Sequence, residues 1–284
     1  MRIPGALNPY SPYSARLVQK HGFEAVHLSG AVLSAELCLP AIGLTTSAET
    51  AARAQQVTRV TDLPVLIDAD TGFGAPVNAA RTASSSRTPA WRVCTWRTRR
   101  PSSAAATSKA RRSSRAGRWR NGCARPPTPD ATATSSSWPA PTRGRSRAST
   151  RRSTAKAYVD AGADAIFPEA LADEAEFAAF RRALDVPLLA NLTEFGKTPL
   201  LGARTPEDLG YNLALYPVTL FRLANGAVED GLRTLAAEGT QGSLLPRMQT
   251  RSRLHEVLGC ADYSAFDSAV PPDARTPGRR SSAR

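Results

Sequence analysis

The chain has 284 residues, enough for one large domain or two small ones with a sizeable core. It contains no run of about 18 apolar residues that could span a bilayer and no apolar leader, so we expect a cytoplasmic protein. The four cysteines form no C-x-x-C pair and the three histidines no ligand cluster, so neither a disulfide framework nor a zinc site is expected.

The positive charge is confined to one part of the chain. The net charge is +13 and the pI about 10.4, values that ordinarily suggest a polyanionic partner. Residues 81–153, however, hold 17 Arg, one Lys and one Asp, a net charge of +17 that leaves −4 for the remainder. Outside this segment the chain is mildly acidic.

The first part of the chain alternates apolar runs with helical stretches, the pattern of an α/β protein. Strands are expected at 2–8, 24–29 and 64–68, and the last two are apolar enough for a sheet that is covered on both faces. The sequence from Thr46 to Glu49 matches a capping box and predicts a helix that runs to Val60.

Similar elements resume after residue 153. Gly162 is expected to end the first helix, and Thr205 as N-cap with Pro206 at the first helical position is expected to begin a later one. In chain order the expected elements are a helix at 155–161, a strand at 164–168, a helix at 173–184, a strand at 186–191, a short helix from 205, a strand at 211–216 and helical periodicity to about 258.

The expected strands indicate the fold class. Three precede and three follow a gap as long as two βα units, so eight is the natural total, and a (β/α)₈ barrel of about 250 residues fits the length. We therefore expect an α/β protein with one TIM-type barrel domain over 1–270, interrupted by an aberrant segment at 82–153. A polar tail at 271–284 is expected to be disordered.

Residues 82–153 differ in composition from their flanks. They contain no Leu, Ile, Phe, Tyr or Met, Val93 is their only β-branched aliphatic residue, and all four tryptophans of the chain lie among their Arg, Ser, Ala, Thr and Pro. Neither a helix stripe nor a strand face can be drawn. We therefore expect a disordered segment that replaces about two βα units and leaves an eight-stranded barrel unable to close.

The flanks carry specific motifs. An Asp-x-Asp lies within Leu66 to Gly74, Asn-Leu-Thr-Glu-Phe-Gly occupies 191–196, and Met-Gln-Thr-Arg occupies 248–251. Through these motifs the chain resembles the 2-methylisocitrate lyases of the isocitrate lyase/phosphoenolpyruvate mutase superfamily, over 1–81 and about 154–270. The resemblance implies Mg²⁺-assisted retro-aldol cleavage of 2-methylisocitrate, a small tricarboxylate, to pyruvate and succinate. It also implies Mn²⁺ as an alternative metal and a homotetramer with exchanged C-terminal helices.

The same family accounts for the aberrant segment. Its members carry H-L-E-D, K-R-C-G-H and A-R-T-D in this part of the chain. When GC-rich codons are read one base late, V-H-L-E-D becomes Cys94 to Thr98, C-G-H becomes Ala105 to Thr107, and V-A-R-T-D-A becomes Trp138 to Arg143. We interpret 82–153 as a doubly frameshifted stretch. The catalytic cysteine of the family is lost at 104–107, so no catalytic residue is intact and the chain is expected to be inactive or nearly so.

Asp68 and Asp70 are the predicted metal ligands. Strand alternation would point both carboxylates to one side, at the carboxyl end of a strand, where the active sites of barrels lie. A turn or helix cap is the alternative for an isolated Asp-x-Asp, but the motif resembles the magnesium site of the family. Ala41 stands where the family has an aspartate near the metal, and this departure weakens the site.

Substrate contacts are predicted at the other strand ends, from hydroxyl, amide, carboxylate and backbone N–H groups, and from two arginines suited to bidentate carboxylate binding. For each position the alternative is structural: a tight turn, a helix cap or a solvated side chain. By resemblance the substrate contacts are Ser29, Gly30, Ala31, Glu169, Asn191, Leu192, Thr193, Arg222 and Arg251.

Two other functions stay open on sequence alone. One is a sister lyase, decarboxylase or phosphonomutase that acts on a related 2-hydroxy or 2-oxo acid. The other is a basic nucleic-acid-binding protein, in which the arginines of 82–153 contact phosphates and its tryptophans stack on bases. The second is disfavoured because the frameshift accounts for the same composition, so no nucleic-acid or membrane partner is expected.

Overall fold

The computed structural model describes residues 3–74, 76–85, 93–97, 131–135 and 147–269. The chain divides into two compact units, residues 1–225 and residues 226–284. The helix α9 (Thr219–Glu238) crosses from the first unit into the second, and each unit is described by itself. The tail predicted at 271–284 lies outside the described residues, and the single-domain boundary at 270 stays a prediction.

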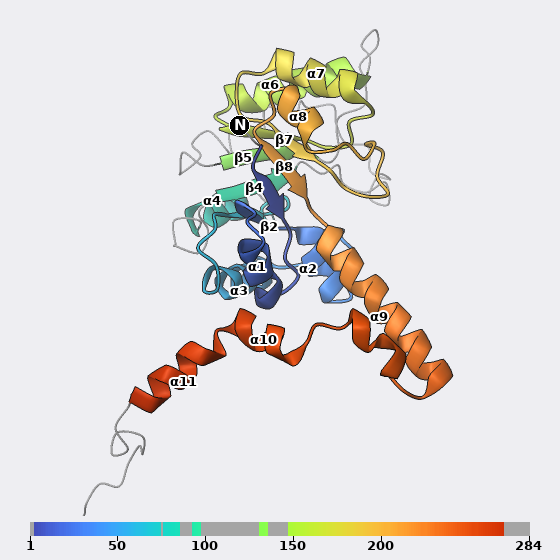
Figure 1. The fold of residues 1–284 in the computed structure, drawn as a ribbon. Helices are drawn as coiled ribbons and strands as arrows, with labels where there is room; N and C mark the ends of the chain where they lie inside the picture. The colour runs from blue at the N-terminus through green and yellow to red at the C-terminus, as the bar shows by residue number, and fades with distance from the viewer. Residues whose placement is uncertain (1–2, 75, 86–92, 98–130, 136–146, 270–284) are drawn as a thin grey trace, which may run out of the picture. The chain divides into compact units, whose positions relative to one another are not determined.

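The first unit is built on eight parallel strands (Figure 1). Their order in the sheet is β6-β5-β4-β3-β2-β1-β8-β7. A parallel bridge between Ile166 and Leu188 joins the two ends of this sheet, and the Ile166 N–H donates to the Pro187 carbonyl at 2.9 Å. The sheet therefore closes into the predicted barrel. The strands are β1 (Gly5–Leu7), β2 (Ala25–Leu28), β3 (Val65–Asp68), β4 (Val93–Arg97), β5 (Ala131–Ser135), β6 (Ala165–Pro168), β7 (Leu189–Asn191) and β8 (Leu213–Tyr216).

The aberrant segment contributes two of these strands, contrary to prediction. β4 pairs with β3 and β5, and β5 pairs with β6, all in parallel register. The expectation that the segment has no strands and that the barrel cannot close is therefore wrong. The reason is that the ladder of a sheet is made by backbone N–H and C=O groups, which every residue other than proline provides in full, whatever its side chain.

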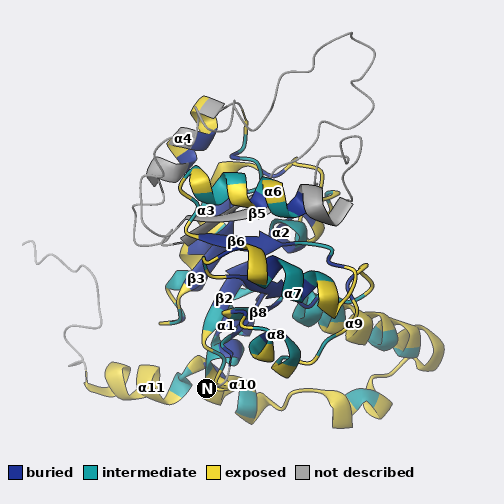
Figure 2. Cartoon of the chain, turned by 90° about the horizontal axis from the view of Figure 1, so that it is seen from above, coloured by how far each residue is buried: buried dark blue, intermediate teal, exposed yellow. Residues whose placement is uncertain are grey.

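Three buried clusters show how the barrel is filled. Side chains from alternate strand positions, such as Leu66, Phe167 and Leu215, pack together inside the barrel. Their neighbours, such as Val26 and Ile67, face outward and pack with residues of the covering helices. In Figure 2 the strands are accordingly the most deeply buried layer, within helices that are intermediate or exposed on their outer sides. This two-sided burial explains the near-continuous apolar runs of the sequence.

Helices follow most of the strands. In chain order they are α1 (Pro12–Lys20), α2 (Gly30–Glu36), α3 (Ser47–Thr58), α4 (Pro76–Ser85), α6 (Arg147–Asp160), α7 (Glu174–Ala183), α8 (Arg204–Asp208) and α9. The helix predicted at 155–161 is longer than expected, because its first residues come from within the aberrant segment. Gly162, at φ 97°, ends this helix in the left-handed conformation that glycine adopts without strain.

Helix caps were predicted with mixed success. The capping box at the start of α3 is confirmed, since the Thr46 hydroxyl accepts from the Glu49 N–H at 3.2 Å and the Glu49 carboxylate accepts from the Thr46 N–H at 2.7 Å. The N-cap predicted at Thr205 is wrong, because α8 begins at Arg204, two residues before the predicted first helical residue Pro206, and Ala203 is its N-cap. The chain turns into α8 at Gly202, whose carbonyl accepts a hydrogen bond from the Thr205 backbone N–H.

These two threonines make a matched test of the capping box. Thr46→Ala is expected to lower the free energy of unfolding by about 1 kcal/mol, because it removes the acceptor of a backbone N–H at the helix start. Thr205→Ala removes a hydroxyl without a capping role and is expected to change it by less than about 0.5 kcal/mol. Urea unfolding of both variants measures the difference. Equal losses would contradict the assigned cap.

The second unit is helical. It contains the rest of α9, a 3₁₀ turn at Gly242–Arg247, α10 (Arg251–Leu258) and α11 (Cys260–Ala269). The helical periodicity predicted to about 258 is confirmed, and α11 extends beyond it. Gly259 separates the last two helices at φ 72°.

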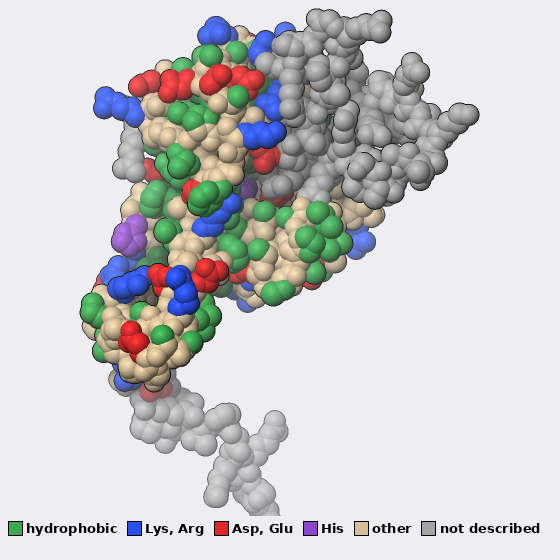
Figure 3. Space-filling view, turned by 90° about the vertical axis from the view of Figure 1, so that its right-hand side faces the viewer, with side chains coloured by type: hydrophobic (Ala, Val, Ile, Leu, Met, Phe, Trp, Pro, Cys, Tyr) green, Lys and Arg blue, Asp and Glu red, His purple; other side chains and the backbone are tan. Residues whose placement is uncertain are grey.

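The described surface carries charges of both signs. On the face drawn in Figure 3, acidic and basic side chains are interspersed. Among the described helices, none combines the length and the apolar composition that a membrane span requires.

Candidate functional site

The predicted site residues of the first unit follow the carboxyl ends of strands. Asp68 ends β3, Asn191 ends β7, Ser29 directly follows β2 and Glu169 directly follows β6. Because all eight strands are parallel, these ends lie at one edge of the barrel. The structure thus places these four predicted residues at a common face.

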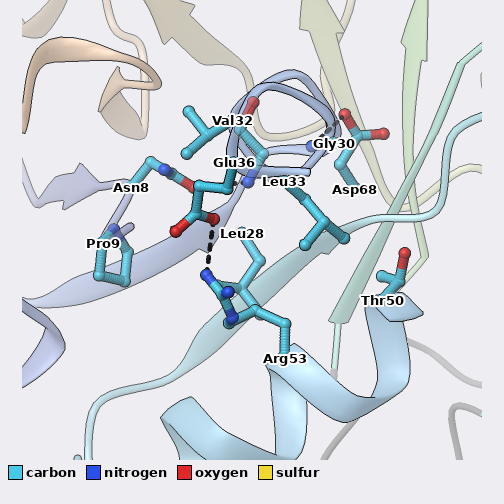
Figure 4. Close-up of a pocket in the computed structure, with 11 residues that line it drawn as sticks. Asn8, Pro9, Leu28, Gly30, Val32, Leu33, Glu36, Thr50, Arg53 and Asp68 are labelled. Atoms are coloured by element: carbon cyan, nitrogen blue, oxygen red, sulfur yellow. Dashed lines mark hydrogen bonds and ion pairs between the residues drawn. The ribbon is translucent and has the colours of Figure 1, made fainter. Parts of the chain in front are cut away.

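Asp68 is held in this group by two backbone hydrogen bonds. Its carboxylate is buried and accepts a hydrogen bond from the Gly30 N–H at 3.1 Å (Figure 4). It also accepts a hydrogen bond from the Asp70 N–H at 2.9 Å. A Cβ on Gly30 would lie 3.1 Å from Asp68 Oδ2, so the absence of a side chain permits this approach. Burial of a carboxylate is favourable only with such partners, and here two backbone donors provide them.

A turn positions Asp70. The prediction that strand alternation positions it is therefore wrong. β3 ends at Asp68, and Asp70 adopts a left-handed conformation with φ 46°. The motif continues with positive φ at Gly72, Phe73 and Gly74. The metal-binding role of the two aspartates stays a prediction, and the described residues contain no group of three or more His, Cys, Asp or Glu side chains that could hold a metal ion.

Strained backbone marks this edge of the barrel. Five described residues other than glycine have positive φ, and four of them follow strand ends: Asp70 and Phe73 after β3, Ala170 after β6 and Phe195 after β7. Such conformations cost about 1–3 kcal/mol each and concentrate at functional sites. The strain therefore supports a site here independently of residue type.

Asn8 is a member of this face that the sequence interpretation passed over. It follows β1, is 1% exposed, and its Oδ1 accepts from the Ser29 N–H at 2.6 Å. Together with Ser29, Gly30 and Asp68 it lines a small pocket (Figure 4). Its position at a strand end was the available signal, because the same rule selected Ser29 and Asp68.

An ion pair lines this pocket. Glu36 of α2 and Arg53 of α3 lie 2.6 Å apart, and Arg53 also donates to the Tyr10 carbonyl at 2.7 Å. Burial raises the pKa of Glu36, and Arg53 partly offsets that increase. The pair ties α2, which begins at the Ser29–Gly30 turn, to α3 and to the loop after β1.

The end of β7 and the residues that follow it carry an amide, on Asn191, and a hydroxyl, on Thr193. Asn191 and Leu192 are buried and Thr193 is half-buried. The buried Asn191 Oδ1 has no hydrogen-bond partner among the described residues. It thus presents a hydrogen-bond acceptor at this edge of the barrel, and its role as a substrate contact stays a prediction.

Arg222 is held by the residues that follow this segment. Its Nη1 donates to the Glu194 carbonyl at 2.6 Å and to the Glu194 carboxylate at 2.8 Å, and its guanidinium lies 5.1 Å from the centre of the Phe195 ring. Thr219 donates to the same carboxylate. This Glu194–Arg222 pairing was not predicted. Arg251 begins α10 in the second unit and is exposed, so its role as a substrate contact stays a prediction.

The pairing affects the titration of Glu194. Burial raises its pKa, but hydrogen bonds from Thr219, from its own backbone and from Arg222 more than offset this, so the pKa is lowered. A lowered pKa in the folded state contributes stability that is present above the pKa of the unfolded chain and is lost as the pH falls through the folded value. The Glu194 carboxylate is therefore ionised at neutral pH and paired with Arg222.

Relatives of known class match almost the whole chain. It is 47% identical over 284 residues to the probable 2-methylisocitrate lyase 2 of Corynebacterium glutamicum, covering 95% of this chain and 87% of the relative. The 2-methylisocitrate lyase of Bacillus subtilis is 39% identical over 283 residues, with 95% and 88% coverage. The chain belongs to the 2-methylisocitrate lyase family. It is thus a member of a carbon–carbon lyase family, as the resemblance implied.

A family model agrees with this membership, and a solved structure shows the same fold. The model of phosphoenolpyruvate phosphomutase matches residues 4–88 and so ends soon after the aberrant segment begins. A crystal structure of 2,3-dimethylmalate lyase, described as a member of the PEP mutase/isocitrate lyase superfamily, superimposes with a TM-score of 0.77 at 24% identity. It covers 94% of this chain and 93% of that one. The predicted barrel of this superfamily is confirmed.

Proposed function

We propose that this member of the 2-methylisocitrate lyase family binds 2-methylisocitrate with Mg²⁺ at the carboxyl edge of its barrel. The observation that carries the proposal is the conjunction of relatives aligned over 95% of the chain with Ser29, Asp68 and Asn191 at one edge of the barrel. The family reaction is cleavage of the substrate to pyruvate and succinate. A phosphonopyruvate hydrolase of the same fold has been solved with oxalate and Mg²⁺.

The residues present fit a magnesium ion. Mg²⁺ commonly binds through one or two carboxylates, with waters and substrate oxygens as the other ligands. Asp68 and Asp70 supply two carboxylates within one hydrogen-bonded turn, and the Asp68 carboxylate is fixed by two backbone donors. When bound, Mg²⁺ supplies positive charge that stabilises the oxygen of the hydroxyl group that becomes the keto group of pyruvate.

The chain's own groups bind and orient the substrate. Asn191 presents an amide acceptor to a substrate hydroxyl, and the Ser29–Gly30 turn presents a hydroxyl at the same edge. The guanidinium of Arg222 neutralises a substrate carboxylate while Glu194 fixes its position. Cleavage leaves a carbanion on the succinate half that needs a proton. The stretch at 104–107, where the family cysteine would stand, lies outside the described residues, and its sequence contains no acid.

Calorimetry tests the proposed binding. The protein is expected to bind 2-methylisocitrate in the presence of Mg²⁺, to lose that binding when EDTA removes the metal, and to bind oxaloacetate and phosphonopyruvate more weakly. Tighter binding of one of these acids would assign the chain to a sister activity. No binding of any of them in Mg²⁺ would overturn the proposal.

We further propose a homo-oligomer assembled through the second unit. Val228, Leu232 and Leu235 of α9 are 57%, 61% and 43% exposed, and their spacing places them on one side of the helix. Further exposed apolar side chains of this unit are Leu245, Met248, Leu254, Leu258, Tyr263 and Phe266. An apolar surface on this scale is typical of an interface between protein chains.

Leu232→Asp tests the oligomer. The unaltered chain is expected to sediment as a species larger than its 30.2 kDa monomer, and the variant is expected to shift towards the monomer, because a charge at an apolar contact is costly to bury. Leu200→Asp, at a residue 70% exposed in the first unit, is the matched control and is expected to leave the assembly unchanged. A monomeric wild-type chain would contradict the proposal.

A further inference from the structure

Asn8 lies at the substrate edge of the barrel with its side chain on the inner side. The preceding strand alternates, with Ala6 in the cluster inside the barrel and Leu7 in the cluster beneath the helices. Asn8 continues this alternation, and its own N–H extends the pairing with β8 by donating to the Tyr216 carbonyl at 3.3 Å. Its side chain is therefore directed inward, in the same layer as Ser29 and Asp68.

A hydrogen bond fixes the orientation of the Asn8 amide. The Ser29 N–H is a donor, so the atom 2.6 Å from it must be the carbonyl oxygen Oδ1 and not the amide nitrogen. The Nδ2 group is thereby directed away from Ser29. It is buried and has no hydrogen-bond partner among the residues that the structure describes.

A buried amide donor without an acceptor is unfavourable, so such groups are uncommon, and a ligand or an ordered water provides the acceptor where they occur. The neighbours of Asn8 in the pocket point to that ligand. Ser29, Gly30 and Asp68 line the same pocket, and Asp68 is a predicted ligand of the metal. The Asp68 carboxylate already accepts from Gly30 and Asp70, and its bonds do not involve Asn8.

We propose that Asn8 is a substrate-binding residue, whose Nδ2 donates a hydrogen bond to a carboxylate oxygen of the bound tricarboxylate. An –NH₂ group offers only donors, and a carboxylate offers only acceptors, so the two are complementary. The inference rests on the proposed function, since it names a further contact in the same site. The hydrogen bond from the Ser29 N–H to Oδ1 keeps Nδ2 oriented towards the substrate carboxylate.

Two substitutions separate this role from mere support of the Ser29 turn. Asn8→Asp keeps an oxygen that accepts from Ser29 but replaces the donor with a second, negatively charged oxygen. Asn8→Ala removes both interactions. If Nδ2 contacts a substrate carboxylate, calorimetric binding of 2-methylisocitrate in saturating Mg²⁺ is expected to weaken about 10-fold for Asn8→Ala and about 100-fold or more for Asn8→Asp.

Acid rescue gives a readout that a structural role would not move. When the pH is lowered from 8 to 5.5, the introduced carboxyl of Asn8→Asp takes up a proton because burial and a facing carboxylate both favour its neutral form, and it then becomes a donor. Binding by Asn8→Asp is expected to recover at least 10-fold relative to wild type at the same pH. Circular dichroism and binding of Mg²⁺ alone show that the variants are folded and that the metal site is intact.

The outcomes are decisive in each direction. Binding by Asn8→Asp that equals or exceeds that of Asn8→Ala, or that shows no recovery in acid, overturns the role of Nδ2 and leaves the proposed function standing. Absence of 2-methylisocitrate binding by the wild-type chain in Mg²⁺ overturns both proposals together. If Asn8→Asp does not fold, Asn8→Ser replaces it. Its shorter side chain cannot reach both partners, and a loss of less than 3-fold overturns the role.

Discussion

Purified protein of this sequence is expected to release pyruvate from 2-methylisocitrate at least about 100-fold more slowly than the same protein with residues 82–153 restored to the family reading frame. A positioned general acid contributes about 10²–10⁴-fold to a rate, and the stretch Ala104 to Thr107 provides none. Restoration consists of shifting the codons of 82–153 back by one base. A coupled assay of pyruvate measures both proteins.

The restored protein carries its own control. Replacing the regained cysteine of the C-G-H motif by alanine is expected to return the rate to that of the unaltered chain, which would assign the defect to the acid. The calorimetric affinity for the substrate is expected to change less than the rate, because Asp68, Asn191 and Arg222 lie outside the segment. Equal rates for the unaltered and restored proteins would contradict both the frameshift interpretation and the predicted inactivity.

Asp68→Asn is expected to weaken Mg²⁺ binding by at least about 10-fold and to lower the free energy of unfolding by about 1–3 kcal/mol. The carboxylate accepts from the N–H groups of Gly30 and Asp70, so an amide places an –NH₂ against one of these donors and leaves a buried polar group unpaired. The negative charge that we propose holds the metal is lost at the same time. Urea unfolding and metal titration measure the two effects.

Asp185→Asn is the control for this substitution. Asp185 is exposed, lies between α7 and β7, and belongs to no predicted site, so both quantities are expected to stay within error of wild type. A stability loss without a change in Mg²⁺ affinity at Asp68 would restrict that residue to a structural role. It would also contradict the metal site.

The parts of the fold that could be predicted were those with strong local signals. The expected strands at 24–29, 64–68 and 164–168 each contain an observed strand, because burial on both faces demands continuous apolar residues. The capping box at Thr46 was recognisable because its two partners are close in sequence. The start of α8 was misplaced by two residues, because it depends on a hydrogen bond from the Thr205 N–H to the Gly202 carbonyl, which no residue type indicates.

The aberrant segment shows where composition misleads. Its residues gave no strand pattern, yet the backbone at 93–97 and 131–135 joins the sheet. A parallel sheet with strands β3 and β6 already in place offers hydrogen-bonding edges to any extended backbone. The side-chain pattern therefore predicts which strands build the core. Whether a segment pairs with the exposed edge of β3 or β6 depends instead on the hydrogen-bonding groups of those neighbouring strands.

The candidate site could be predicted only in part for a similar reason. Strand ends identified Ser29, Asp68 and Asn191, since parallel strands bring their carboxyl ends together. The orientation of the Asn8 amide, whose Nδ2 has no hydrogen-bond partner among the described residues, and the pairing of Arg222 with Glu194 depend on contacts between residues 21 and 28 positions apart. Such contacts have no local signature, so only the three-dimensional structure reveals them.

The closure of the barrel has a consequence for ligand binding. The ring is joined between β6 and β7 by one bridge, Ile166 to Leu188, whereas β5 and β6 pair over four residues. A junction with so few backbone bonds is the place where a barrel opens first in local fluctuations. Glu169 and Asn191 stand on opposite sides of this seam. A substrate that contacts both residues would link the two strands. Substrate binding would then stabilise the closed barrel, and local opening between β6 and β7 would weaken substrate binding.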